Sequence, residues 1–162
     1  MGSYTLPVLP TGLTSEGVYV LTSAQTHGAK IAAVNIMAMD YGSGFSPDMS
    51  QDAIDAATAT QAQIKSVWTT LTDAQAWNTV TVTPVIGLND DTSETFTAAD
   101  ADADATTLVN FAKIEHLAWL SFWSATRDSQ CSAGAITYTD ATCSSNLQTP
   151  GAFGQAFSAD SG

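Results

Sequence analysis

The sequence predicts an α/β fold in which parallel strands alternate with helices. Two kinds of segment alternate along the chain. The first kind is short and apolar, and several of these segments are rich in β-branched residues. The second kind is longer, and its apolar residues recur at helical spacing. The segment 34–39 (VNIMAM) is almost continuously apolar and is soon stopped by glycine. Such a run is typical of a strand that is buried on both faces of a parallel sheet.

Four strand segments and the helices between them follow in order. The strands are expected at 4–9, 34–39, 81–86 and 117–123. The helices are expected at about 14–27 with Thr14 as cap, 50–68 with Ser50 as cap, 106–115, and a short one at 153–157. Pro84 weakens the third strand, because proline cannot donate to the ladder. A closed barrel needs eight strand–helix units in about 250 residues, so this chain is too short for one.

The composition limits the classes of partner. A single domain over residues 1–162 is expected, with a loop-rich tail from about residue 124. Four Lys and Arg against sixteen Asp and Glu give a net charge of −12. Such a surface repels phosphate backbones and anionic membranes, so neither nucleic acid nor a membrane is an expected partner. The longest apolar runs are also too short to span a bilayer.

Cys131 and Cys143 lie twelve positions apart in the tail. This pair is compatible with a disulfide, and hence with an exported protein, although two free thiols remain the alternative. No signal peptide is visible in the sequence. The cysteines lack the histidine cluster of a zinc site, and the alternating Asp100, Asp102 and Asp104 lack the glycine and closing glutamate of a calcium loop. No metal or cofactor is expected.

Asp40 directly follows the apolar run 34–39. The C-terminal ends of parallel strands are where α/β proteins bind their ligands, so Asp40 is a candidate functional carboxylate. The alternative is that Asp40 only begins the turn towards Gly42, because aspartate commonly does so. The local stretch leaves both interpretations open.

Several stretches occur in an informative order and spacing: YTLPVLPTGLTSEGV, VNIMAMDYG, TPVIGLND, FTAADA with TLVNFAK, and LSFWSATRD. Together they resemble the second half of glycoside hydrolase family 18 chitinases, from about Tyr4 to Phe157. The resemblance implies that the chain is half of a (β/α)8 TIM barrel, with strands five to eight. It also implies a secreted protein whose partner is chitin or an N-acetylglucosamine oligosaccharide.

The resemblance also implies a set of substrate-binding residues. The family's sixth strand ends in a Met-x-Tyr-Asp pattern, which Met37, Met39 and Asp40 match, with Met39 in place of the usual tyrosine. Asp40 is in addition the one catalytic candidate. The family's eighth strand ends in a tryptophan that stacks on the central sugar, and here it corresponds to Trp123. Three further residues are included: Tyr41, although strand alternation directs it to the other side, and the loop residues Asn89 and Asp90.

The family's catalytic motif is not found in these 162 residues. Family 18 catalysis is substrate-assisted, with a glutamic acid closing an Asp-x-x-Asp-x-Asp-x-Glu motif on the fourth strand. The glutamates here are Glu16, Glu94 and Glu115, and none closes that spacing. The sequence therefore favours a half-barrel that keeps a carbohydrate site without the family's acid. Two alternatives remain: a hydrolase that uses Asp40 and loop carboxylates (Asp90 or Glu94) across a homodimer, and a structural half-barrel without a ligand.

A half-barrel would expose two sheet edges and the face that normally fills the barrel. Exposed edges and apolar patches favour association. We therefore expect a C2 homodimer, in which two halves close one barrel or pack face to face.

Overall fold

Four parallel strands that neighbour one another in chain order form the main sheet. The structure, a computed structural model, describes residues 2–45, 48–98 and 103–159. The parallel strands are β1 (Gly2–Leu9), β3 (Ile31–Ala38), β4 (Val80–Pro84) and β7 (Trp119–Leu120), and β2 (Gly12–Leu13) pairs antiparallel with β1 at one edge. The predicted alternation of parallel strands and helices is confirmed.

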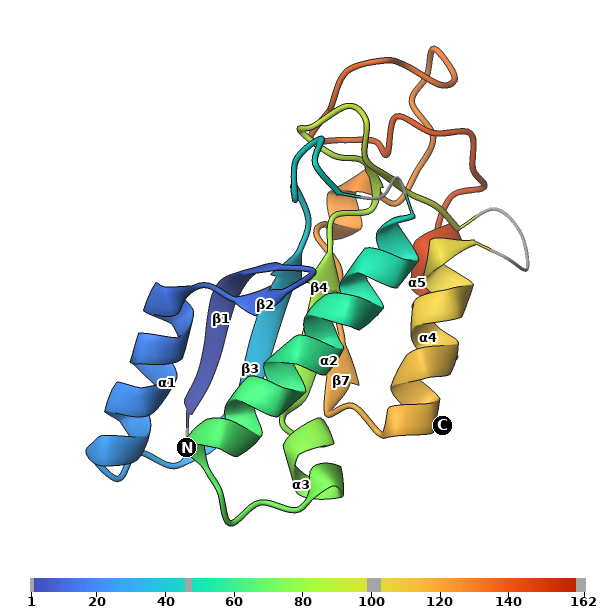
Figure 1. Ribbon diagram of the computed structural model, residues 1–162. Coiled ribbons are helices and arrows are strands. Elements are labelled where there is room, and N and C mark those ends of the chain that lie inside the picture. The colour runs from blue at the N-terminus through green and yellow to red at the C-terminus, as the bar shows by residue number, and fades with distance from the viewer. Residues whose placement is uncertain (1, 46–47, 99–102, 160–162) are drawn as a thin grey trace.

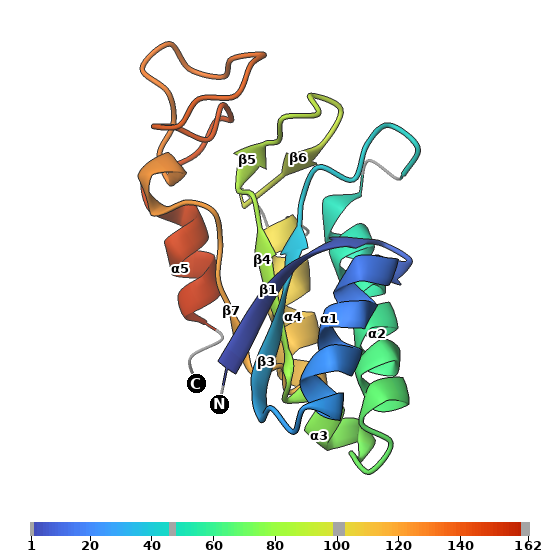
Figure 2. The same cartoon turned by 90° about the vertical axis from the view of Figure 1, so that its left-hand side faces the viewer.

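Three α-helices cover one face of this sheet (Figures 1 and 2). They are α1 (Ser15–Thr26), α2 (Met49–Val67) and α4 (Asp104–Glu115). Right-handed crossovers put successive helices on one face when the strands run in sequential order, as they do here. Two shorter helices complete the set: α3 (Asp73–Trp77) precedes β4, and α5 (Ala152–Ser158) packs on α4.

The core lies between the sheet and these helices. Alternate residues of β3 and β4 face the helices and are fully buried, namely Val34, Ile36, Val80 and Val82. They belong to one cluster with buried helix side chains such as Leu21, Ile64 and Leu108. Because strand residues alternate between faces, the other face is left to residues such as Asn35 and Thr81.

Several boundaries differ from those predicted. Helix α2 begins at Met49, because Asp48 rather than Ser50 is its cap and accepts a hydrogen bond from the Gln51 N–H at 3.0 Å. The last strand is much shorter than 117–123, although the Trp123 N–H still donates to the Pro84 carbonyl at 2.8 Å. Helix α3 and the hairpin of β5 (Gly87–Leu88) and β6 (Thr95–Phe96) were not predicted. Asp100 and Asp102 lie outside the described residues.

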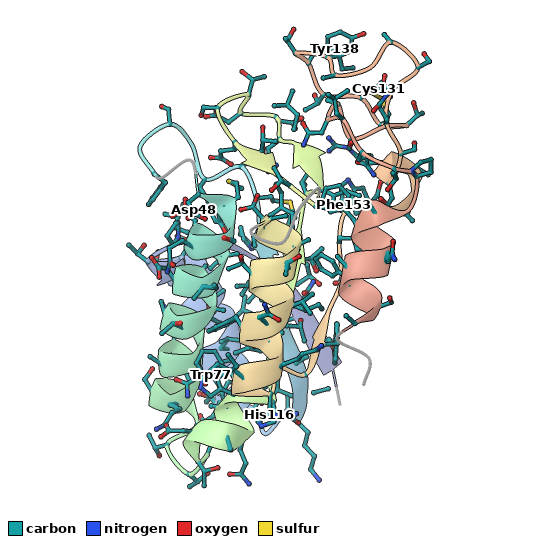
Figure 3. The ribbon with its side chains drawn as sticks, turned by 90° about the vertical axis from the view of Figure 1, so that its right-hand side faces the viewer. Asp48, Trp77, His116, Cys131, Tyr138 and Phe153 are labelled. Carbon is teal, nitrogen blue, oxygen red and sulfur yellow. A yellow bond between two sulfur atoms is a disulfide. The ribbon has the colours of Figure 1, made fainter. Side chains whose placement is uncertain are left out.

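A disulfide joins Cys131 to Cys143, with their Cα atoms 5.0 Å apart. The tail that carries it follows the short 3-10 helix η1 (Ala125–Arg127) and ends in α5. Figure 3 shows Cys131 and Tyr138 in this tail, at the opposite end of the molecule from Trp77 and His116. Aromatic rings tie α5 to the body of the protein, with Phe122 and Phe157 centroids 5.3 Å apart. Among the described helices, none is long and apolar enough to cross a membrane.

Candidate functional site

The sheet face opposite the helices carries side chains in regular layers. Strand register places residues of neighbouring strands side by side on this face. We call it the inner face; its layers are Thr5, Asn35, Thr81 and Trp119, then Pro7, Met37, Thr83 and Ser121, and finally Met39, Val85 and Trp123. The last layer lies where the parallel strands end.

An open cavity of about 600 Å³ lies on the inner face and is lined by residues of all three layers. Five of the predicted site residues line it together, from three different strand ends: Met37, Met39, Asp40, Asp90 and Trp123. Figure 1 shows the segments that follow β3, β4 and β7 gathered at this end of the molecule. Polar residues also line it, namely Thr5, Asn35, Thr83 and Ser121, so the cavity has a mixed apolar and polar floor with the carboxylates of Asp40 and Asp90 beside it.

Trp123 combines a fixed backbone with a free ring. Its N–H donates to the Pro84 carbonyl at 2.8 Å, and its carbonyl accepts the Ile86 N–H at 2.9 Å. Nevertheless, 63% of its surface is exposed. An exposed indole at a cavity on a fixed backbone presents a flat apolar surface to a ligand.

Asp40 is both a cavity residue and part of the loop structure. Its Oδ1 accepts the N–H of Asp90 at 2.9 Å and that of Asp91 at 3.4 Å. Its own N–H donates to the Asn89 Oδ1 at 3.3 Å, and its φ of 49° lies in the left-handed region. Asp40 thus does satisfy backbone donors, but those donors belong to the segment after β5 rather than to its own turn.

Tyr41 and Asn89 do not line the cavity. The Tyr41 ring is buried in the core, and its hydroxyl has no hydrogen-bond partner among the described residues. Burial, followed by the carboxylates of Asp52 and Glu94, raises the Tyr41 pKa above its ordinary value. Asn89 is fully buried, and its Nδ2 donates to the Gly87 carbonyl at 3.2 Å. In this structure both residues support the loops that carry Asp40 and Asp90.

Glu94 has a role that sequence reasoning did not predict. The residue is only 3% exposed, and it lies outside the cavity lining. Its Oε2 accepts the Tyr41 N–H at 3.1 Å and its Oε1 accepts the Gly42 N–H at 2.6 Å. Burial raises the Glu94 pKa; these two hydrogen bonds oppose the rise, and the charges of Asp91 and Asp40 add to it.

Arg127 is a second residue that sequence reasoning missed. Its guanidinium lies at the cavity but the residue is only 6% exposed, and it donates to the Leu88 carbonyl at 2.6 Å and the Cys143 carbonyl at 3.4 Å. Burial lowers the Arg127 pKa, whereas the carboxylates of Asp90, Asp40 and Asp140 raise it. Arg127 therefore joins the tail to β5 and lies near the rim carboxylates. Its only sequence signal was a lone arginine after the tryptophan strand.

Among the described residues, no group of three or more His, Cys, Asp or Glu side chains is arranged so that it could hold a metal ion.

The sequence is similar to two curated chitinases, although no protein-family model matches it. It is 34% identical over 133 residues to "Endochitinase 11" from Metarhizium anisopliae, across 77% of this chain and 25% of that protein. The identity is also 34% over 133 residues with the "Probable bifunctional chitinase/lysozyme" of Escherichia coli, of which 14% is covered. The chain thus spans a quarter or less of the length of these relatives.

Solved structures show the same relationship. The catalytic domain of a hyperthermophilic chitinase from Pyrococcus furiosus matches with a TM-score of 0.88 and 28% identity, over 98% of this chain and 50% of that chain. Catalytic-site mutants of active domain 2 of a thermostable chitinase from the same organism, complexed with chito-oligosaccharides, match equally well. The resemblance to family 18 chitinases is thereby confirmed, and the fold of this chain corresponds to about half of a chitinase TIM-barrel catalytic domain.

Proposed function

We propose that the chain forms a chito-oligosaccharide-binding half of a chitinase-type barrel. The observation that carries this proposal is the cavity at the strand ends, where Met37, Met39, Asp40, Asp90 and Trp123 meet. Relatives of this chain are chitinases, and one solved relative was crystallised with chito-oligosaccharides. Sugar rings have an apolar face and a polar edge, so they suit an exposed indole surrounded by carboxylates and hydroxyls.

The site is proposed to bind rather than to hydrolyse. Glycosidic cleavage requires an acid within reach of the scissile oxygen, and removal of a general acid typically costs about 10²–10⁴-fold in rate. Both oxygens of Glu94 are occupied by backbone N–H groups outside the cavity lining. Asp40 already accepts two N–H groups through Oδ1. These contacts favour binding over the alternative of a hydrolase built from Asp40 or Glu94.

The test is a titration with the tetramer of N-acetylglucosamine, followed by calorimetry and by amide chemical shifts. Trp123→Ala is expected to weaken binding at least about fivefold, because stacking on a large aromatic surface contributes more than about 1 kcal/mol. Tyr19→Ala is the matched control: Tyr19 is 73% exposed on α1, away from the cavity. Equal affinities of the native protein and Trp123→Ala would contradict the proposal. The same samples, assayed for hydrolysis with and without Asp40→Asn, test the catalytic alternative.

We further propose that a second copy of the chain covers the inner face as a homodimer. Trp119 on this face is 43% exposed, and the chain matches only half of the Pyrococcus domain. Burying such a face against a two-fold partner is the simplest way to remove it from water. Sedimentation equilibrium at micromolar concentration should give a dimer, and Thr83→Lys in the middle of the face should dissociate it, whereas Tyr19→Lys should not. A monomeric native protein would contradict this proposal.

Secretion is the last part of the proposed function. Disulfides persist mainly in oxidising environments, and Cys131 and Cys143 form one here. Protein isolated from its natural source under thiol-blocking conditions should therefore show no reactive cysteine. Two labelled thiols in such material would contradict an extracellular location.

A further inference from the structure

Two segments far apart in sequence are held together beside the cavity: the Asp40 loop (residues 40–42) and the hairpin turn (residues 89–94). Strand β3 ends at Ala38, so no sheet ladder joins them. Instead, side chains bond to backbone N–H groups in both directions. Asn89 and Glu94 accept from the Asp40 loop, and Asp40 accepts from the hairpin turn. The position of the Asp40 carboxylate therefore depends on the hairpin turn.

Glu94 is the fixed partner in this arrangement. Its own backbone is held within the hairpin turn, because its N–H donates to the Asp91 carbonyl and its carbonyl accepts the Asn89 N–H, both at 3.0 Å. The next residue but one, Phe96, is fully buried. The Glu94 carboxylate is buried and anchored, and its two oxygens accept hydrogen bonds from two consecutive backbone N–H groups. It therefore fixes the positions of those N–H groups.

The Asp40 loop has a backbone conformation that needs such support. Asp40 has a φ of 49° and Gly42 a φ of 93°, so two of the three residues lie on the left-handed side. Non-glycine residues keep such angles only where the surroundings hold them. In this conformation the N–H groups of Tyr41 and Gly42 both point to the Glu94 carboxylate. Removal of that carboxylate should let the loop relax.

We propose that Glu94 is the positioning residue of the sugar site: its ionised carboxylate holds the Asp40 loop, and loss of that charge releases Asp40 and weakens ligand binding. The hold of Glu94 on the Asp40 loop concerns the protein alone, whereas its effect on ligand binding rests on the proposed function. Glu94 thereby makes the sugar site sensitive to acid.

The surroundings of Glu94 set the direction of this sensitivity. The charged groups that act on it are Asp91 in the hairpin turn, Asp40 in the loop and Asp52 on α2, all of them carboxylates, with the buried Tyr41 hydroxyl nearby. Burial and like charge raise the pKa of Glu94 above the ordinary glutamate value. As the pH falls, Glu94 should therefore become neutral before an exposed glutamate does. Asp52 is the competing titrant, because its pKa is raised as well.

The test on the protein alone follows the Tyr41 and Gly42 amide resonances in ¹H–¹⁵N spectra from pH 7 to pH 4. Both amides should shift together, with a midpoint above that of the exposed Glu16 carboxyl group. In Glu94→Gln they should already occupy new positions at pH 7 and titrate no further. In Asp52→Asn the transition should persist. A transition that persists in Glu94→Gln and disappears in Asp52→Asn would overturn the proposal.

The test on the site measures tetramer affinity. Glu94→Gln should weaken binding about tenfold at pH 7 and remove the loss of affinity on acidification, while Glu16→Gln should behave as the native protein. Unchanged affinity in Glu94→Gln would overturn the positioning role. If neither the native protein nor the variant binds the tetramer, the proposed function fails, and the amide shifts still decide whether Glu94 holds the loop. If Glu94→Gln does not fold, the native and Asp52→Asn titrations decide it.

Discussion

Gly87 is expected to be the least replaceable glycine of the described chain, because it lies where the disulfide-bonded tail meets the hairpin. A Cβ atom at this position would lie 2.0 Å from the Ser144 carbonyl oxygen and 2.6 Å from the Ser144 Cβ. The φ of Gly87 is also +77°, in the left-handed region. Gly87→Ala should therefore cost about 1–2 kcal/mol for the backbone conformation and about 1–3 kcal/mol for displacing the tail. The adjacent bond from the Leu88 N–H to the Ser144 carbonyl, 2.9 Å long, contributes about 1 kcal/mol more.

Gly134→Ala is the matched control for this prediction. Gly134 has a φ of +87°, but the nearest atom to an added Cβ is the Leu147 Cδ2 at 4.0 Å. Its replacement should cost only the backbone part, about 1–2 kcal/mol. Urea unfolding followed by tryptophan fluorescence measures both variants, and limited proteolysis shows whether the tail has detached. A Gly87→Ala protein no less stable than Gly134→Ala would refute the close approach of Gly87 to Ser144.

Two further stability predictions follow from buried groups. Replacing both Cys131 and Cys143 by serine should lower the unfolding free energy by about 3 kcal/mol, the usual value for a short loop, and urea unfolding of the native protein with and without reductant checks it independently. Asp52→Asn should raise stability by about 1 kcal/mol at pH 7, because the Asp52 charge is buried near other carboxylates and its Oδ2 has no partner within the described residues. Burial raises the Asp52 pKa, and so do the negative charges of Asp55, Glu94 and Asp48. The folded protein therefore binds a proton at the Asp52 carboxylate more tightly than the unfolded chain does. The native protein therefore loses stability as the pH rises through that pKa, and the advantage of Asp52→Asn should vanish on acidification; an advantage that persists at low pH would contradict this reasoning.

The parts of the fold predicted correctly are those with a local signal. Apolar runs such as 34–39 predict strands, because both faces of a parallel sheet are buried. Thr14 was correctly expected to cap α1, and its side chain accepts the Gly17 N–H. The resemblance to chitinases rests on motifs at strand ends, which is where Met37, Asp40 and Trp123 line the cavity. These residues are recognisable because they lie at or within three residues of the end of an apolar strand segment.

The parts that were missed depend on partners distant in sequence. The hairpin of β5 and β6 has strands of two residues each, too short for any periodicity to show. Glu94 bonds to Tyr41 and Gly42 more than fifty residues away, so its role could not be derived from spacing. Ser50 was predicted as the cap of α2, and Asp48, two residues earlier, was not considered although aspartate is an equally good cap. The structure favours Asp48, since a start at Met49 buries that side chain.

The polar side chains of the inner face are suited both to contact with water in the single chain and to contact with a second chain. The hydroxyls of Thr81 and Thr83 both donate to the Asn35 Oδ1 at 2.8 Å, and the Thr83 and Ser121 hydroxyls are 2.6 Å apart. Because these groups satisfy one another, covering them leaves few unpaired polar atoms, which would otherwise cost about 1–3 kcal/mol each. When the face is uncovered, the half-buried Asn35, Thr83 and Ser121 can still be hydrated, whereas Thr81 is fully buried already. These paired polar groups, beside the apolar side chains of the same face, are therefore compatible with the proposed half-barrel that folds first and then associates with a second half.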